Sequence, residues 1–141
     1  MTINYSSGND IIIPTNNTTY RGLKGDDIYV ISKAIPSDTS LTIVDTEGKN
    51  TIQLADGLEI SSTKFSSSAF QITLSNGAII NISAADKNSY EIGGNITGGI
   101  RVEQKNYLEF SKLFGIQAFP KSGASSGDTN IVIKETSLGS N

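Results

Sequence analysis

The sequence predicts an all-β domain, and three observations support this fold class. Isoleucine is the main apolar residue, small polar residues are frequent, and charged residues make up only 18% of the 141 positions, which favours sheets. Turn residues recur roughly every 8–12 positions through residues 1–60, the spacing of an all-β fold. An Asn76-Gly77 pair separates two apolar runs and predicts a β-hairpin. A chain of this length is expected to form one domain.

Residues 1–60 predict short strands separated by turns. Each strand is an apolar, β-branched run that a proline, a glycine or a polar cluster ends. The expected strands lie in DIIIP (10–14), DIYVIS (27–32), LTIVDTEGKNTIQL (41–54, divided by a turn at EGKN) and ADGLEI (55–60, after a turn). The polar segments 15–25 and 33–40 are expected to be a loop and a turn.

Residues 69–83 carry the clearest local signal. Apolar and polar residues alternate through AFQITL (69–74), and a second apolar run follows Asn76-Gly77. Because Asn-Gly suits the positive φ angles of a type I′ turn, we expect a hairpin closed by that turn.

The C-terminal region has a helical pattern. Tyr107, Phe110 and Phe114 stand at helical spacing within EQKNYLEFSKLF (103–114), and Gly115 follows as a helix stop. We therefore expect one short helix whose aromatic side chains join the core. The alternative is that these side chains form a docking surface for another subunit.

The chain divides into two expected regions. Residues 1–102 are expected to form a β-domain, and residues 103–141 to hold the helix, a linker and a terminal strand. The linker is the Ser/Gly-rich segment 121–130, which has a flexible composition. The terminal strand is expected at 130–136.

The absence of two residue types narrows the chemistry. The chain has no cysteine and no histidine, which excludes a Ser-His-Asp triad, a cysteine nucleophile and a histidine-ligated zinc site. No nucleophile and base stand out as a pair, so we expect no enzyme activity. A net charge of −3 argues against nucleic-acid binding, and no apolar stretch approaches the length of a membrane span.

Three segments share one spacing, G-x-[DN]-x-U, where U is a large apolar residue. They are GNDII (8–12), GDDIY (25–29) and GKNTI (48–52). Glycine permits a tight bend, the Asp or Asn two positions later points inward, and U shares the inward face of the following strand. The pattern is the second half of the calcium-binding nonapeptide G-G-x-G-x-D-x-U-x. Residues 22–30 match it best, with only the second glycine replaced, by Leu23.

These repeated segments predict one or two calcium sites. Calcium accepts about six to eight oxygen ligands in flexible geometry, which the carboxylates and carbonyls of a bend can supply. The expected metal-binding residues are Asp10, Gly25, Asp26, Asp27 and Asn50. Asn50 brings no charge, so its copy is expected to bind weakly. The alternative is that the aspartates only cap turns by accepting backbone N–H bonds.

On these residues the chain resembles the RTX family of bacterial proteins exported by type I secretion. GDDIYVIS (25–32) carries the resemblance, followed in order by TIVDTEGKNTIQL (42–54), DGLEI (56–60) and the hairpin QITLSNGAIINI (71–82). This order is similar to the haemolysin-type calcium-binding region that follows a β-roll, and it covers roughly residues 5–100. With this resemblance and the helical pattern above, we expect an all-β fold in which an irregular β-roll- or solenoid-like N-terminal part continues into a β-sandwich, with one short C-terminal helix.

The resemblance also implies a function. It implies a non-enzymatic, calcium-binding structural module that folds after secretion and serves surface attachment or assembly. Calcium is the implied cofactor, and the implied location is extracellular or on the bacterial cell surface. In the family the export signal lies near the C-terminus, here within 103–141, and the N-terminal MTINYSSGND has no Sec-type signal.

Two other functions remain open from the residues. The strand-like run INYSSGNDIIIP (3–14) could add to a sheet edge of another subunit, which suits a self-assembling surface-layer, filament or matrix protein. A polar β-surface could instead bind carbohydrate without metal. The expected partners are therefore further copies of this chain, other surface proteins or a cell-surface glycan.

Overall fold

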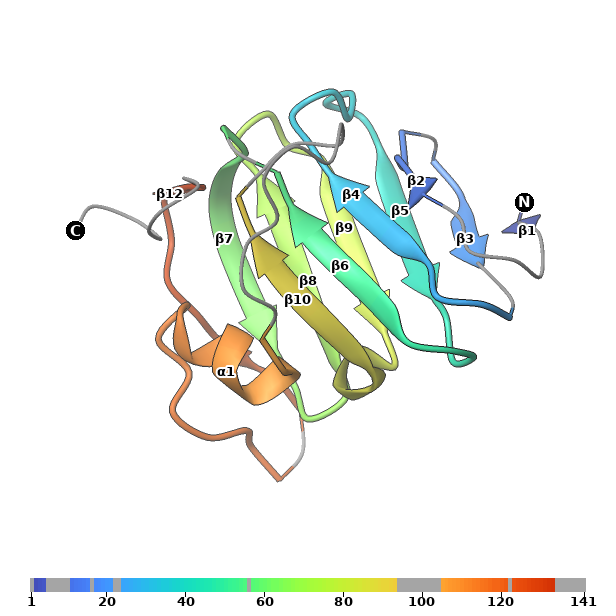
Figure 1. Ribbon diagram of the computed structural model, residues 1–141. Coiled ribbons are helices and arrows are strands. Elements are labelled where there is room, and N and C mark those ends of the chain that lie inside the picture. Colours follow the sequence, from blue (N-terminus) through green and yellow to red (C-terminus); the bar gives the residue numbers. More distant parts are fainter. Residues whose placement is uncertain are drawn as a thin grey trace.

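The computed structural model describes residues 2–4, 11–15, 17–21, 24–55, 57–93, 105–121 and 123–133. Within these residues the chain forms two β-sheets that lie face to face, with one short α-helix at one end of them (Figure 1). The predicted all-β class and the predicted short C-terminal helix are thereby confirmed. No helix in this part of the chain has the length and apolar character needed to cross a membrane.

Among the described residues, the larger sheet has eight strands and the smaller sheet has four. The order in the larger sheet is β1 (Thr2–Asn4), β3 (Thr19–Arg21), β5 (Ser40–Val44), β9 (Ile79–Ser83), β8 (Ala69–Leu74), β7 (Glu59–Phe65) and β11 (Ser125–Ser126), and β12 (Ile131–Val132) also pairs with β7. The order in the smaller sheet is β10 (Asn88–Ile92), β6 (Asn50–Leu54), β4 (Ile28–Ile31) and β2 (Ile11–Ile12). The described helices are the 3-10 helix η1 (Ala85–Lys87) and α1 (Tyr107–Lys112).

The chain passes back and forth between the two sheets. Strands β1 to β6 alternate between the larger and the smaller sheet, and β9 and β10 make one more such pass after β7 and β8. Successive passes pair in parallel, so that Ile11 pairs with Ile28 and Ile28 with Thr51. These intervals of 17 and 23 residues are also those between the glycines of the three repeated segments. The spacing of the repeated segments therefore matches the pairing register of the strands in the smaller sheet.

The predicted hairpin is present, but its turn is not type I′. The Gly77 N–H donates to the Leu74 carbonyl over 2.9 Å, and Gly77 has a φ of 100°. A type I′ turn also needs a positive φ at Asn76, which is not among the residues with positive φ. Asn76 Nδ2 donates to the Ile35 carbonyl and its Oδ1 accepts from the Ala78 N–H, both over 2.9 Å. A longer turn that makes these bonds therefore replaces the two-residue turn.

Helix α1 is shorter than the predicted segment because a capping box sets its start. The Asn106 side chain accepts from the Glu109 N–H over 2.8 Å, and the Glu109 carboxylate accepts from the Asn106 N–H over 2.9 Å. Gly115 follows the helix with a φ of 87°, as its predicted role as a helix stop requires. Residues 103 and 104 lie outside the described residues.

Three strand segments depart from the predictions. β3 lies in the expected loop at 15–25, β7 continues to Phe65 beyond the expected 55–60, and β11 lies in the expected linker at 121–130. β3 and β11 have only 3 and 2 residues, too few to show the alternation that identifies a strand. Because β11 and β12 pair with β7, the C-terminal region shares a sheet with the N-terminal one.

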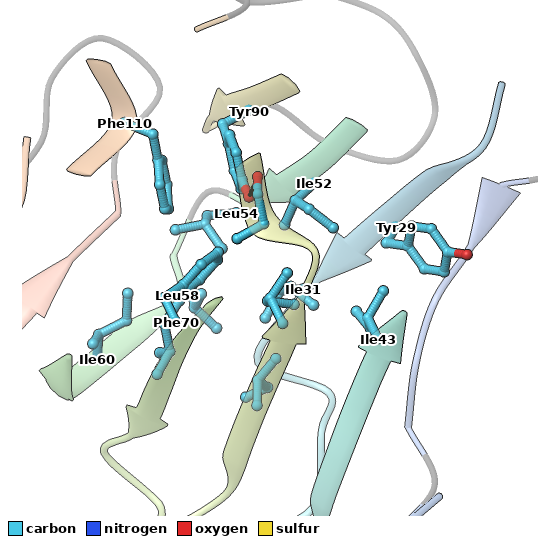
Figure 2. Close-up of a cluster of buried hydrophobic side chains, with 14 of the residues drawn as sticks. Tyr29, Ile31, Ile43, Ile52, Leu54, Leu58, Ile60, Phe70, Tyr90 and Phe110 are labelled. Carbon is cyan, nitrogen blue, oxygen red and sulfur yellow. Dashed lines mark hydrogen bonds between the residues drawn. The ribbon is translucent and has the colours of Figure 1, made fainter. Parts of the chain in front are cut away.

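The core lies between the two sheets. Figure 2 shows buried side chains from both sheets in this space, among them Ile43 of the larger sheet and Ile31 and Ile52 of the smaller one. At the end next to α1 the core becomes aromatic. Phe110 of α1 stacks on Tyr90 of β10, with ring centroids 4.3 Å apart and planes 15° apart (Figure 2). The predicted core role of the helix aromatics is confirmed.

Candidate functional site

The structure brings two of the three repeated segments side by side. The turn at Gly25–Asp27 precedes β4 and the turn at Gly48–Asn50 leads into β6, and the pairing of Ile28 with Thr51 sets the first turn against the second. Of the predicted metal-binding residues, four therefore lie on adjacent turns. The fifth, Asp10, belongs to the segment 5–10, which lies outside the described residues.

The backbones of the two turns are in close contact at their glycines. Gly48 has a φ of 78°, and a Cβ at this position would lie 1.9 Å from the Gly25 carbonyl oxygen. Gly25 itself has a φ of 99°. Glycine is therefore required at Gly48 for two reasons, a left-handed backbone conformation and an approach that no side chain permits.

Hydrogen bonds from side chains to backbone join the two turns. The Lys49 N–H donates to Asp26 Oδ1 over 2.9 Å, and the Asp27 N–H donates to Asn50 Oδ1 over 3.0 Å. Asn50 Nδ2 also donates to the Glu47 carbonyl over 2.8 Å, within its own turn. Asp26 and Asn50 thus act as caps for the neighbouring turn, which is the structural role that the sequence left open for these residue types.

The two adjacent aspartates differ in solvent exposure. Asp26 is exposed, whereas Asp27 is fully buried with a relative exposure of 0%. Asn50 is also buried, and the U residues Tyr29 and Ile52 lie on the same inward side. The inward orientation that the repeat predicts for its Asp or Asn is therefore observed in both described copies. A carboxylate held inside the protein needs polar or charged neighbours to offset its desolvation.

A second buried carboxylate lies near this turn. The Tyr29 hydroxyl donates to Asp45 Oδ2 over 2.7 Å in a buried hydrogen bond, and Asp45 Oδ1 accepts from the Glu47 N–H over 3.2 Å. Asp45 is 2% exposed. Its burial depends on Tyr29, 16 positions earlier, so local sequence did not indicate it.

A buried polar residue also lies on β10, the strand next to β6. Asn88 pairs with Asn50 in the parallel ladder and is buried, and its Oδ1 has no hydrogen-bond partner among the described residues. Burial raises the pKa of the Tyr90 hydroxyl, and its hydrogen bond with the Asn88 side chain acts in the opposite direction. Asn88-Ser89-Tyr90 repeats the [DN]-x-U spacing, but Asp86 stands where the other copies have glycine, so the repeat pattern does not identify Asn88.

The described residues contain no group of three or more acidic, histidine or cysteine side chains that could hold a metal ion. A calcium ion at the stacked turns would therefore need amide and backbone carbonyl oxygens in addition to carboxylates. These are ligands that calcium accepts.

A shallow groove lies on the outer face of the larger sheet. It has a volume of about 380 Å³, and its polar lining comes from Lys64, Ser66, Gln71, Asn81 and Ser83. Lys64 pairs with Gln71 and Gln71 with Asn81, so these three form one row across β7, β8 and β9. Gln71 Nε2 donates to Asn81 Oδ1 over 2.9 Å. The row offers amide and ammonium groups to a polar ligand.

Fold and site together define an all-β protein whose repeated turns are stacked in register and joined by side-chain hydrogen bonds. No protein-family model matches this chain, and no curated protein or solved structure matches it. The function therefore has to be inferred from the turns, faces and edges of the sheets.

Proposed function

We propose that this chain is a non-enzymatic structural module of the RTX type, an irregular β-roll that binds calcium and works outside the cell. The observation that supports this most is the stacking of GDDIY (25–29) on GKNTI (48–52) in register. Parallel strands that alternate between two sheets are consistent with a β-roll. In a β-roll, calcium lies between successive turns, which is the location of these two segments.

The stacked turns supply the types of oxygen ligand that calcium binds. Asp26 and Asp27 supply carboxylates, Asn50 supplies an amide oxygen, and the bends supply carbonyls. Two features are expected to weaken calcium binding at these turns. Asn50 is neutral, and the Lys49 side chain adds a positive charge. We therefore expect a dissociation constant of about 10⁻⁴–10⁻³ M, as in extracellular calcium modules.

Calcium is expected to raise the melting temperature of the full chain relative to excess EDTA. A ligand at ten times its dissociation constant adds about 1.4 kcal/mol to the free energy of unfolding. For a chain of this size that corresponds to a rise of about 5 °C. Differential scanning calorimetry with calcium, magnesium or EDTA measures it, and magnesium is expected to give a much smaller rise because it demands stricter octahedral geometry.

A matched pair of variants locates the calcium effect. Asp27→Asn keeps the size of the buried side chain but removes its charge, so the calcium-dependent rise should disappear. Asp38→Asn removes the same charge from an exposed residue of the turn before β5, so the rise should persist. Identical melts of the wild-type protein in calcium and EDTA, or a full rise in Asp27→Asn, would contradict calcium binding at these turns.

The groove on the larger sheet supports a second candidate function, metal-free binding of a neutral glycan. Calorimetric titration with cellohexaose and chitohexaose in EDTA should then show saturable binding to the wild-type protein. Gln71→Ala should weaken it at least tenfold, because Gln71 lies at the centre of the polar row. Asp27→Asn is the control and should bind normally. Absence of binding to either sugar by the wild-type protein would reject this candidate for these glycans.

A further inference from the structure

Each sheet has two lateral edges, and the two sides of the molecule on which these edges lie, here called its ends, differ in how the chain covers them. At one end, β11 and β12 pair with β7, and the Tyr90 N–H donates to the Lys105 carbonyl over 2.7 Å at the edge of the smaller sheet. The Lys105 N–H donates back to the Tyr90 carbonyl over 2.8 Å, and Phe110 of α1 stacks on the Tyr90 ring. This end, the covered end, therefore has its edge strands occupied by the chain itself.

The opposite end, formed by β1 and β2, is the open end. Among the described strands, β1 pairs with β3 alone and β2 pairs with β4 alone. Ile11 is 63% exposed and Ile13 is 39% exposed, whereas Ile12 between them is buried. Two large apolar side chains thus lie exposed on the same side of an edge strand. An edge strand of this kind presents unpaired backbone groups and apolar surface to another strand.

This asymmetry selects the kind of partner. Proteins built from stacked passes need ends that differ from their interior, because an interior pass buries its faces only against neighbours. The covered end cannot accept a further strand at β7 or β10 without displacing β11, β12 or Lys105. Among the described residues, the exposed large apolar side chains Ile11 and Ile13 lie together on the open end, whereas Val132 stands alone on β12, so we expect a second copy to join through its own open end. Contact between identical surfaces gives a closed twofold dimer and not a filament.

We propose that two copies of this chain form a twofold dimer in which β2 of each copy pairs antiparallel with β2 of the other, centred on Ile12. In this register Ile11 of one copy lies opposite Ile13 of the other on the outer face. Side chains directly opposite each other in an antiparallel pair are in contact, so both exposed isoleucines become covered. Pro14 has no N–H and limits the ladder to a few residues, so we expect a reversible dimer.

The dimer is independent of calcium, because none of its contacts involves the stacked turns. Sedimentation velocity over a wide range of protein concentration should give monomer at low and dimer at high concentration, equally in calcium and in EDTA. A strict monomer at every concentration overturns the dimer without bearing on calcium binding. Species that grow beyond the dimer overturn the twofold closure.

Charge substitutions test the surface. Ile11→Lys and Ile13→Lys should each weaken dimerisation at least tenfold while leaving the melting temperature of the monomer nearly unchanged, since both side chains are exposed. Val132→Lys is the matched control, because Val132 is 43% exposed and lies on β12 at the covered end. Loss of the dimer in Val132→Lys, or its persistence in both isoleucine variants, overturns the assignment.

Disulfide cross-linking tests the register. The chain has no cysteine of its own, so single introduced cysteines report only on their own positions. Ile11→Cys mixed with Ile13→Cys should give an oxidised mixed dimer, whereas each variant alone should give much less. Absence of the mixed product overturns the antiparallel register.

Discussion

Replacing Gly48 with alanine is expected to lower the free energy of unfolding by about 4 kcal/mol. A left-handed conformation costs a residue with a side chain about 1–2 kcal/mol, and Gly48 has a φ of 78°. Overpacking adds about 1–3 kcal/mol, because the new methyl group would lie 1.9 Å from the Gly25 carbonyl oxygen. That oxygen belongs to the backbone of the neighbouring turn, so relief requires the two stacked turns to separate.

Gly123→Ala is the matched control for this prediction. Gly123 has a similar φ of 73°, and a Cβ there would meet no atom within 4 Å. Its loss should therefore be limited to the conformational cost of about 1–2 kcal/mol. Urea unfolding of both variants in EDTA gives the two values. Equal losses would mean that the contact between the turns contributes nothing to stability, and the stacked arrangement of Gly25 and Gly48 would have to be abandoned.

The repeated segments were the most predictable part of this site. The spacing alone indicated that Gly25 and Gly48 occupy equivalent bends, that Asp27 and Asn50 face inward, and that Tyr29 follows on the same face. Local rules suffice for this, because glycine, the polar residue and the apolar residue act within five positions of one another. The structure pairs Ile28 with Thr51, and these two residues are separated by the same interval as Gly25 and Gly48.

The contacts between turns could not be predicted in this way. Asp26 and Asn50 accept from backbone N–H groups 23 positions away along the chain. The sequence identifies both as polar turn residues but does not say which N–H each will meet, since that depends on the register of another strand. The burial of Asp45 is a similar case, because its partner is the Tyr29 hydroxyl. The metal role predicted for these turns remains a prediction.

Phe110→Ala is expected to cost about 3–5 kcal/mol of the free energy of unfolding, the usual loss for a fully buried phenylalanine. Phe110 stacks on Tyr90 at 4.3 Å and lies against Phe70 and Phe114, with ring centroids 5.3 and 5.1 Å away. The ring joins helix α1 to both sheets. The cavity left by its removal would open at the point where the C-terminal region covers the sheets, so the helix should lose its main attachment.

Leu108→Ala on the same helix is the control. Leu108 is 42% exposed, and alanine is the best helix former, so the change should stay within about 0.5 kcal/mol. Urea unfolding measures both variants. If Phe110→Ala costs no more than Leu108→Ala, α1 is an appendage and not part of the core.

The Tyr90 hydroxyl gives a local measure of the same change. In the native protein, burial raises its pKa well above the ordinary value of 10.0. Its folded pKa is raised, so its contribution to stability is complete below pH 10 and is lost as the pH rises toward the folded pKa. Phe110→Ala admits water beside the ring and should move the pKa of Tyr90 down toward its ordinary value, which an ultraviolet titration of tyrosine ionisation detects. A loss of stability with an unchanged titration would mean that the ring packing of Phe110 on Tyr90 is not what excludes water from the covered end.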